Sequence, residues 1–232
     1  MNQLKKFDFT QAEIDKLCAM QDTLNQMVHP EWKRQKFDWM FAIIDECREI
    51  KEHLGWKWWK GTYKVGLTEA NKKQVQLEVI DILHFVLSDW VEANYTHYLQ
   101  ENFNTPCGPV SLDYAVSRTI DFAATGRGDC MGECWVKLAH GVGLTKQEIL
   151  ETYVQKYVLN KFRQDHGYKD GSYVKEWKVL VGSADKLTPF PLEDNEVLAG
   201  IVFDLAESGQ DTTGETLLYS KLKFEYNNRL NQ

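Results

Sequence analysis

VQLEVIDILHFVL, residues 75–87, is the stretch that decides the fold, because it is apolar almost all round an α-helix. A helix of that kind is buried on most of its sides. Glu78, Asp81 and His84 interrupt it at every third position, which places neighbouring members on one slanted stripe of the helix. Carboxylates are almost never buried unless they are paired or coordinate a metal. The stretch therefore predicts a buried helix with an ion-binding stripe.

A preceding helix, predicted for residues 38–54, offers a second pair of acids. Glu46 and Glu49 stand three positions apart, opposite an apolar line. Carboxylates that converge from two facing helices repel one another unless a cation lies among them, and hard oxygen ligands suit Mg²⁺ or Mn²⁺ better than zinc. Asp45, Glu49 and Glu52 form an equally good stripe, so a solvated acidic face is the alternative for this helix taken alone.

Few prolines and helical spacing of the apolar residues predict a nearly all-helical chain. We expect one all-α domain over residues 1–232, a helical bundle with a loop-rich insertion at residues 100–133 that suits a mobile lid. An irregular stretch is expected from residue 167 to Pro191. Helices are expected at residues 10–29, 38–54, 68–98, 145–164, 193–207 and 214–230.

The composition excludes several classes of protein. The net charge is −7 and no basic block occurs, which argues against nucleic-acid binding. No apolar run reaches the roughly 18 residues of a membrane span, and the N-terminal MNQLKKFDFT lacks the apolar region of a signal peptide. Five scattered cysteines argue for reduced thiols rather than a disulfide framework. We therefore expect a cytoplasmic protein that binds neither membranes nor nucleic acid.

A group of basic residues lies between positions 156 and 175. Lys156, Asn160 and Arg163 share one face of a predicted helix, and Lys169 and Lys175 follow soon after it. Arginine presents a planar fork to phosphate oxygens, and lysine presents a mobile charge. A triphosphate requires cations of this kind opposite a carboxylate–metal cluster. Without the acidic residues, a solvated basic helix end would be the better interpretation.

Polar and aromatic residues could form a pocket for a base. Gln21 and Asn25 lie one turn apart beside the buried stripe of the first predicted helix. Two amides offer both donors and acceptors to the edge of a pyrimidine, although polar surface residues would show the same spacing. The run WKWWK at residues 56–60 directly follows the acidic helix. Such rings either stack on bases or belong to a core or an interface.

Four motifs together resemble those of a known family. DECREIKEHLGWKWWK (45–60), EVIDILHF (78–85), KYVLNKFRQDHGYKDGSY (156–173) and EDNEV (193–197) are similar to motifs of the dimeric dUTPases, all-α nucleoside triphosphate pyrophosphatases of kinetoplastids, bacteria and phages. The likeness runs from Gln21 to about Leu198. The insertion at 100–133 matches no family motif, and Gly55 stands where some members have a small hydroxyl residue.

The resemblance implies a role for each candidate residue. It implies ligands for roughly two or three Mg²⁺ ions at Glu46, Glu49, Glu78 and Asp81. It implies contacts to uracil at Gln21, Asn25 and the stacking ring of Trp59. It implies contacts to deoxyribose at His84 and Asn160. It implies contacts to phosphates at Lys156, Arg163, Tyr168, Lys169 and Lys175.

The implied reaction is hydrolysis of dUTP to dUMP and pyrophosphate by attack of water at the α-phosphorus, with Glu49 as general base. An amide can be flipped to suit cytosine, so dCTP, alone or with dUTP, remains an alternative, as does dUDP. A non-catalytic helical module that binds nucleotide and metal is the alternative from another class. A di-iron protein is weaker, because it requires ExxH pairs that the acidic helices lack. The resemblance also implies a homodimer, in the cytoplasm of the host if a phage encodes it.

Overall fold

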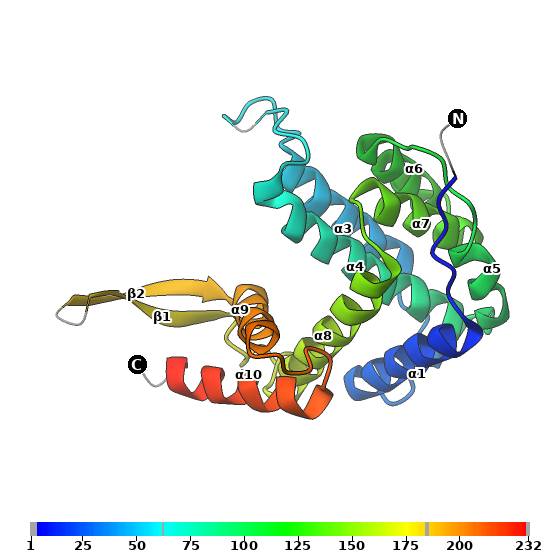
Figure 1. Ribbon diagram of the computed structural model, residues 1–232. Coiled ribbons are helices and arrows are strands. Elements are labelled where there is room, and N and C mark those ends of the chain that lie inside the picture. Colours follow the sequence, from blue (N-terminus) through cyan, green and yellow to red (C-terminus); the bar gives the residue numbers. More distant parts are fainter. Residues whose placement is uncertain (1–3, 62, 184–185, 231–232) are drawn as a thin grey trace. The chain divides into compact units, whose positions relative to one another are not determined.

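The computed structural model describes residues 4–61, 63–183 and 186–230, which are mostly helical (Figure 1). The chain separates into two compact units, residues 1–152 and 153–232. The first unit contains α1 (Gln11–Val28), α2 (Trp32–Gln35), α3 (Trp39–Leu54), α4 (Glu69–Glu92), η1 (Thr96–Tyr98), α5 (Leu99–Phe103), α6 (Leu112–Ala124), η2 (Gly128–Cys130) and α7 (Met131–Gly141). The second contains β1 (Glu176–Ser183), β2 (Lys186–Glu193), α9 (Asp194–Glu207) and α10 (Glu215–Leu230), while α8 (Lys146–Asp165) begins in the first unit and continues into the second. The all-α prediction is confirmed, and the prediction of a single domain stays a prediction.

The apolar helix α4 lies at the centre of the first unit. It packs against α1, α3 and α7, and it runs side by side with α3 in Figure 1. Val79, Ile80 and Leu83 are fully buried. This burial on several faces explains why the sequence of α4 is apolar nearly all round rather than along one stripe.

The end of α4 differs from the prediction, which extended this helix to Tyr98. The helix ends at Glu92, and Asn94 then adopts a φ of 61°. That left-handed conformation cannot continue an α-helix, and asparagine tolerates it better than most residues do. The chain then continues through η1 and α5.

Local capping explains why the other helix ends were predictable. Thr10 and Glu13 form a capping box at the start of α1, where the sequence predicted the helix to begin. The Asp38 side chain accepts from the backbone amide of Phe41 in the first turn of α3, and Gly55 ends that helix with a φ of 75°. These signals depend on side chains within one turn of the helix end.

The insertion at residues 100–133 is more helical than predicted. It contains most of α5, all of α6 and the first residues of α7. Helix α6 packs against both α3 and α7. Phe103, Val116 and Met131 are fully buried, so the segment contributes to the core of the first unit. Pro106, Gly108, Pro109 and Gly126 lie in the two short connections that flank α6, which made the whole segment look loop-rich. A mobile lid stays a prediction.

The second unit contains a β-hairpin that the sequence analysis expected to be irregular. β1 and β2 are antiparallel, with a register from Glu176 opposite Glu193 to Ser183 opposite Lys186. Pro189 and Pro191 lie in β2 and made a strand unexpected, because proline lacks the N–H of a ladder bond. A two-stranded sheet tolerates them because each strand has an edge on which no partner needs that donor.

The core beside this hairpin is aromatic. Trp177 of β1 is fully buried, and its ring centroid lies 5.1 Å from that of Tyr226 on α10 and 6.0 Å from that of Phe162 on α8. Edge-to-face pairs of this kind are favourable beyond the area that they bury. Within the described part of the chain, no helix is long and apolar enough to cross a membrane.

Candidate active site

Acidic side chains of α3 and α4 meet in the first unit. One carboxylate oxygen from each of Glu46, Glu49 and Glu78 lies within 4.8 Å of the others. All three residues are half-buried, and the side chain of Glu78 is only 12% exposed. Like charges this close repel one another unless a cation lies among them. The convergence of these three predicted ligands is therefore found in the structure.

The packing of α3 on α4 brings the carboxylates together. Ile43, Cys47 and Ile50 are fully buried and form the inner line of α3, which packs against α4. Glu46 and Glu49 each precede a member of that line by one position. At 100° per residue they lie on the border between the packed and the solvated faces of the helix.

Asp81, the fourth predicted ligand, lies three positions after Glu78 on α4 and is half-buried. The group of mutually close carboxylates found among the described residues does not include it. Successive turns of a helix are about 5.4 Å apart along the axis, so Asp81 is displaced by nearly one turn from Glu78. Its role as a ligand stays a prediction.

Two basic side chains, His53 and Arg48, contact this acidic group. His53 Nε2 lies 3.2 Å from Glu78 Oε1, and this hydrogen bond is the main reason why the pKa of His53 is raised. Arg48 donates from Nε to Asp45 at 2.9 Å and from Nη2 to Glu49 at 3.2 Å. His53 stands one turn after Glu49, and that spacing was the only clue in the sequence.

The donor set fits a hard divalent cation. It consists of carboxylate oxygens alone, and it is partly withdrawn from water. Its three carboxylates outnumber the two basic neighbours, His53 and Arg48. Mg²⁺ and Mn²⁺ prefer oxygen ligands of this kind, whereas zinc prefers nitrogen and sulfur. The residues that would hold the ion are Glu46, Glu49 and Glu78, with Asp81 as the predicted fourth.

Three of the predicted base- and sugar-binding residues, Gln21, Asn25 and His84, belong to a buried hydrogen-bond network between α1 and α4. Gln21, Asn25 and His84 are all less than a tenth exposed. Gln21 Nε2 donates to Asn25 Oδ1 at 2.9 Å, and Gln21 Oε1 lies 2.6 Å from His84 Nδ1. Ser88, which the sequence analysis did not select, lies at the centre of this network and is fully buried.

Trp59 lies in the loop after α3 and is 56% exposed. Its ring meets those of Trp56 and Trp58 edge to face, with centroids 5.3 and 5.6 Å apart. Lys57 pairs with Glu52 at the end of α3. The loop therefore presents an aromatic surface to solvent, next to the helix that carries the acidic group, and stacking of Trp59 on a base stays a prediction.

The predicted phosphate-binding residues lie in the second unit. Lys156 is 1% exposed, and its Nζ donates to Asn195 Oδ1 at 3.1 Å. Arg163 is also buried, and it donates from Nη1 to Asn160 Oδ1 at 2.9 Å. Lys169 and Lys175 are exposed, as is Tyr168, whose ring lies 5.8 Å from Arg163 Cζ.

Asp194 engages Arg163 in a forked ion pair that the sequence analysis did not predict. The distances are 2.8 Å from Nε to Oδ2 and 2.7 Å from Nη2 to Oδ1. Tyr173 donates its hydroxyl to Asp194 Oδ2 at 2.9 Å. Burial acts to raise the pKa of Asp194, but these donors outweigh it and leave the pKa lowered. The backbone amide of Asp194 also binds the carbonyl of Lys175 at 3.0 Å.

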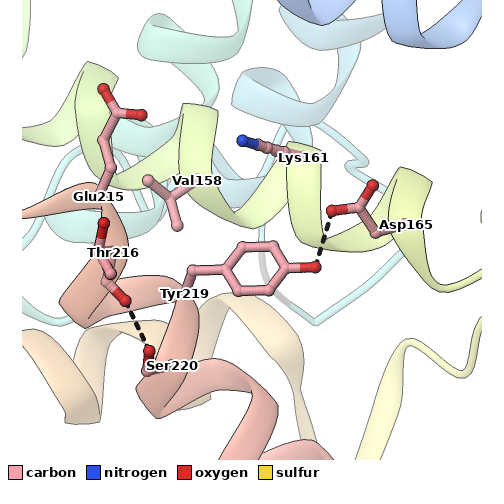
Figure 2. Close-up of a pocket in the computed structure, with 7 residues that line it drawn as sticks. All are labelled: Val158, Lys161, Asp165, Glu215, Thr216, Tyr219 and Ser220. Carbon is pink, nitrogen blue, oxygen red and sulfur yellow. Dashed lines mark hydrogen bonds between the residues drawn. The ribbon is translucent and has the colours of Figure 1, made fainter.

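A hollow of about 290 Å³ lies between α8 and α10 in the second unit (Figure 2). Tyr219 donates to Asp165 Oδ2 at 2.7 Å across its floor. Its charged side chains are Lys161, Asp165 and Glu215, so acids outnumber the base. None of its residues is a predicted site residue, and its charge does not suit a polyphosphate.

The predicted site residues thus form three groups. The acidic group and the amide network belong to the first unit, and the basic residues belong to the second. The apposition of acids and cations across a triphosphate stays a prediction.

A comparison with models of protein families identifies the family of this chain. The family model for dUTPase matches residues 13–168, a segment that includes the acidic group, the amide network and α8. Lys169, Lys175 and Asp194 lie beyond the matched segment. A search of curated proteins finds no match. The family match covers more than half of the 232 residues, and the chain therefore belongs to the dUTPase family of enzymes.

Proposed function

We propose that this enzyme hydrolyses dUTP to dUMP and pyrophosphate in a reaction that requires Mg²⁺. The observation that supports the metal requirement is the convergence of Glu46, Glu49 and Glu78 within 4.8 Å, inside the segment that the dUTPase family model matches. A bound divalent ion lowers the pKa of a coordinated water and neutralises charge on phosphate oxygens. Mn²⁺ has the same ligand preference and is the expected substitute.

Glu49 is the carboxylate that we assign to proton transfer. It lies at the solvated border of α3, where Arg48 already contacts it at 3.2 Å. In the proposed mechanism Glu49 accepts the proton of the water that attacks the α-phosphorus. Glu46, Glu78 and Asp81 would hold the metal together with Glu49, and His53 keeps the carboxylate of Glu78 in place through its hydrogen bond.

The remaining candidate residues bind the nucleotide in this proposal. Gln21 and Asn25 read the base, and Trp59 stacks on it; the buried amide network supports the first role, and the exposed ring of Trp59 supports the second. His84 and Asn160 contact the sugar.

Phosphate binding in this proposal depends on the basic residues of the second unit. The exposed residues Tyr168, Lys169 and Lys175 contact the phosphates directly. Lys156 and Arg163 are buried among Asn195, Asn160 and Asp194, so they reach the phosphates only at the edge of that polar cluster.

Isotope labelling tests the position of attack. Hydrolysis in H₂¹⁸O with Mg²⁺ places the label in dUMP when water attacks the α-phosphorus and in pyrophosphate when it attacks the β-phosphorus. We expect label in dUMP, and no turnover after removal of divalent ions by EDTA. Turnover that persists in EDTA contradicts the metal requirement, and label in pyrophosphate contradicts the position of attack.

Substitutions test the roles of the acids. Glu49→Gln and Asp81→Asn should each lower kcat by at least about a hundredfold, the scale of a lost acid–base or electrostatic contribution. Asp45→Asn is the matched control, because Asp45 also pairs with Arg48 but lies outside the close acidic group. Near wild-type turnover of both test variants would rule out the assignment.

The base preference is tested with a panel of nucleotides. Comparison of kcat/KM for dUTP, dCTP, dTTP and dUDP separates a dUTP enzyme from a dCTP or dual enzyme. We expect dUTP to be preferred, since the amide pair offers a donor and an acceptor to the edge of uracil. Preferred hydrolysis of dCTP contradicts this part of the proposal.

We further propose that the enzyme is a homodimer of the cytoplasm. The exposed rings of Trp56 and Trp58 are of the kind typical of an interface. Light scattering coupled to size-exclusion chromatography measures the mass directly. The expected value is twice the 27.0 kDa of the chain, and a mass of one chain contradicts the dimer.

A further inference from the structure

We propose that Ser88 is a positioning residue that fixes the direction of every hydrogen bond in the buried network of Gln21, Asn25 and His84. In doing so it keeps a proton on Nδ1 of His84, which selects the Nδ1–H tautomer of the neutral imidazole. Ser88 is fully buried on α4, one turn after His84.

The first step concerns the single hydrogen of the Ser88 hydroxyl. Ser88 Oγ lies 2.7 Å from the backbone carbonyl oxygen of His84. A carbonyl can only accept, so the hydroxyl hydrogen must be donated there. Ser88 Oγ has no second hydrogen, and it is therefore an acceptor toward every other neighbour.

The second step fixes the two amides. The terminal atoms of Gln21 and Asn25 that face Ser88 Oγ both lie 2.9 Å from it. Since Oγ accepts, both atoms must be nitrogens, and this follows from the positions of the heavy atoms alone. The side-chain oxygens of both amides must therefore point away from Ser88.

The third step fixes the histidine. The second N–H of Gln21 Nε2 is donated to Asn25 Oδ1 at 2.9 Å, and Gln21 Oε1 is left facing His84 Nδ1 at 2.6 Å. An amide oxygen only accepts, so His84 Nδ1 must carry a proton. In the neutral imidazole, Nε2 is then an acceptor.

The consequence concerns the ligand and rests on the proposed function. A nucleoside group that meets His84 Nε2 must bring a hydrogen to it, as a hydroxyl of deoxyribose or an N–H group does. Without the Ser88 hydroxyl, either amide can turn over, and His84 can then take the opposite tautomer and present a donor instead.

Nitrogen NMR tests the tautomer without any assay of activity. Long-range proton–nitrogen correlations of ¹⁵N-histidine-labelled enzyme, recorded near pH 8, about 1.5 units above the ordinary histidine pKa of about 6.5, distinguish the two neutral forms. The signals of His84 are those that disappear in His84→Gln. We expect the Nδ1–H form in the wild type and a mixture with the Nε2–H form in Ser88→Ala.

A matched control separates this role from the loss of any buried hydroxyl. Thr119 on α6 is also buried and donates to the carbonyl of Ala115 at 2.9 Å, so Thr119→Val removes a similar bond outside the network. We expect Ser88→Ala to raise the KM for dUTP about tenfold and to change kcat by less than about threefold. Thr119→Val should change neither the KM nor the histidine spectrum.

Each outcome decides between the alternatives. An Nε2–H form of His84 in the wild type overturns the proposal even if Ser88→Ala does not fold. A pure Nδ1–H form in folded Ser88→Ala removes the role of Ser88. Absence of dUTP hydrolysis by the wild type refutes the proposed function but leaves the tautomer result standing.

Discussion

Asp194→Ala is expected to destabilise the second unit by leaving a buried charge without its partner. Asp194 is completely buried and Arg163 is 8% exposed, so water cannot replace the lost carboxylate. The change removes both bonds of the fork and the acceptor of the Tyr173 hydroxyl. The cost therefore falls on one guanidinium and one hydroxyl group in a site withdrawn from water.

Breaking a buried ion pair from one side costs about 3–5 kcal/mol. With a cost of about 4 kcal/mol and a urea dependence of about 2 kcal/mol per M, the midpoint of unfolding should fall by about 2 M. Far-UV circular dichroism in a urea titration measures this shift. Asp165→Ala is the matched control, because Asp165 is exposed and accepts only the hydroxyl of Tyr219; its midpoint should move by less than about 0.5 M.

A double variant distinguishes the cost of an unpaired buried charge from the cost of disturbed packing in the second unit. Arg163→Met combined with Asp194→Leu replaces both charges with apolar side chains, which is often neutral or stabilising. The double variant should therefore recover most of the midpoint that Asp194→Ala loses. A midpoint for Asp194→Ala within about 0.5 M of the wild type would refute the reasoning, since the guanidinium would then need no partner.

The same pair predicts a dependence on pH. The pKa of Asp194 is lowered in the folded enzyme, so the folded state holds this proton less tightly than the unfolded chain does. The stability that the pair provides is present above the ordinary carboxyl pKa of about 3.9 and is lost as the pH falls through the lower folded value. Asp194→Ala should lack this part of the acid destabilisation.

Three further predictions concern the first unit. Thr10→Ala removes the acceptor of the Glu13 amide in the capping box of α1. The free energy of unfolding, measured by urea titration, should fall by about 1 kcal/mol. An unchanged free energy of unfolding would argue against a stabilising cap. Trp135→Ala removes a fully buried ring and its bond to the Val79 carbonyl; a loss of about 3–5 kcal/mol is expected by the same measurement, and a loss below about 1 kcal/mol would show that the site collapses around the gap. Burial raises the pKa of the Cys47 thiol to about 12. In the folded enzyme, Cys47 should therefore react with a disulfide reagent near neutral pH far more slowly than the half-buried Cys130 does. Equal rates for the two cysteines would contradict the burial of Cys47.

The sequence predicted the helices best where their ends depend on neighbours within one turn. The caps at Thr10, Asp38 and Gly55 are of this kind, and all three are where they were expected. The hairpin was missed because its two prolines argued against a strand. Whether a proline is tolerated there depends on the absence of a third strand, and no local rule reveals that.

Part of the candidate site could also be predicted from the sequence. The acids of α4 stood out because their neighbours are apolar, and three of the four predicted ligands are close together in the structure. His53 and Ser88 were missed because each matters only through partners that lie far away in the sequence. His53 contacts Glu78 across 25 positions, and Ser88 binds Gln21 across 67.

The sequence by itself determined most of the long helices, the buried faces of those helices and the charged positions among the buried ones, because turn geometry and hydrophobic periodicity act over a few residues. Only the tertiary structure decided how the polar groups are satisfied. It commits Arg163 to Asp194 rather than leaving its guanidinium in solvent, and it closes Gln21, Asn25 and His84 into one network around Ser88. A buried hydrogen bond requires two groups within about 3 Å in the right direction, and the packing of whole helices sets that distance.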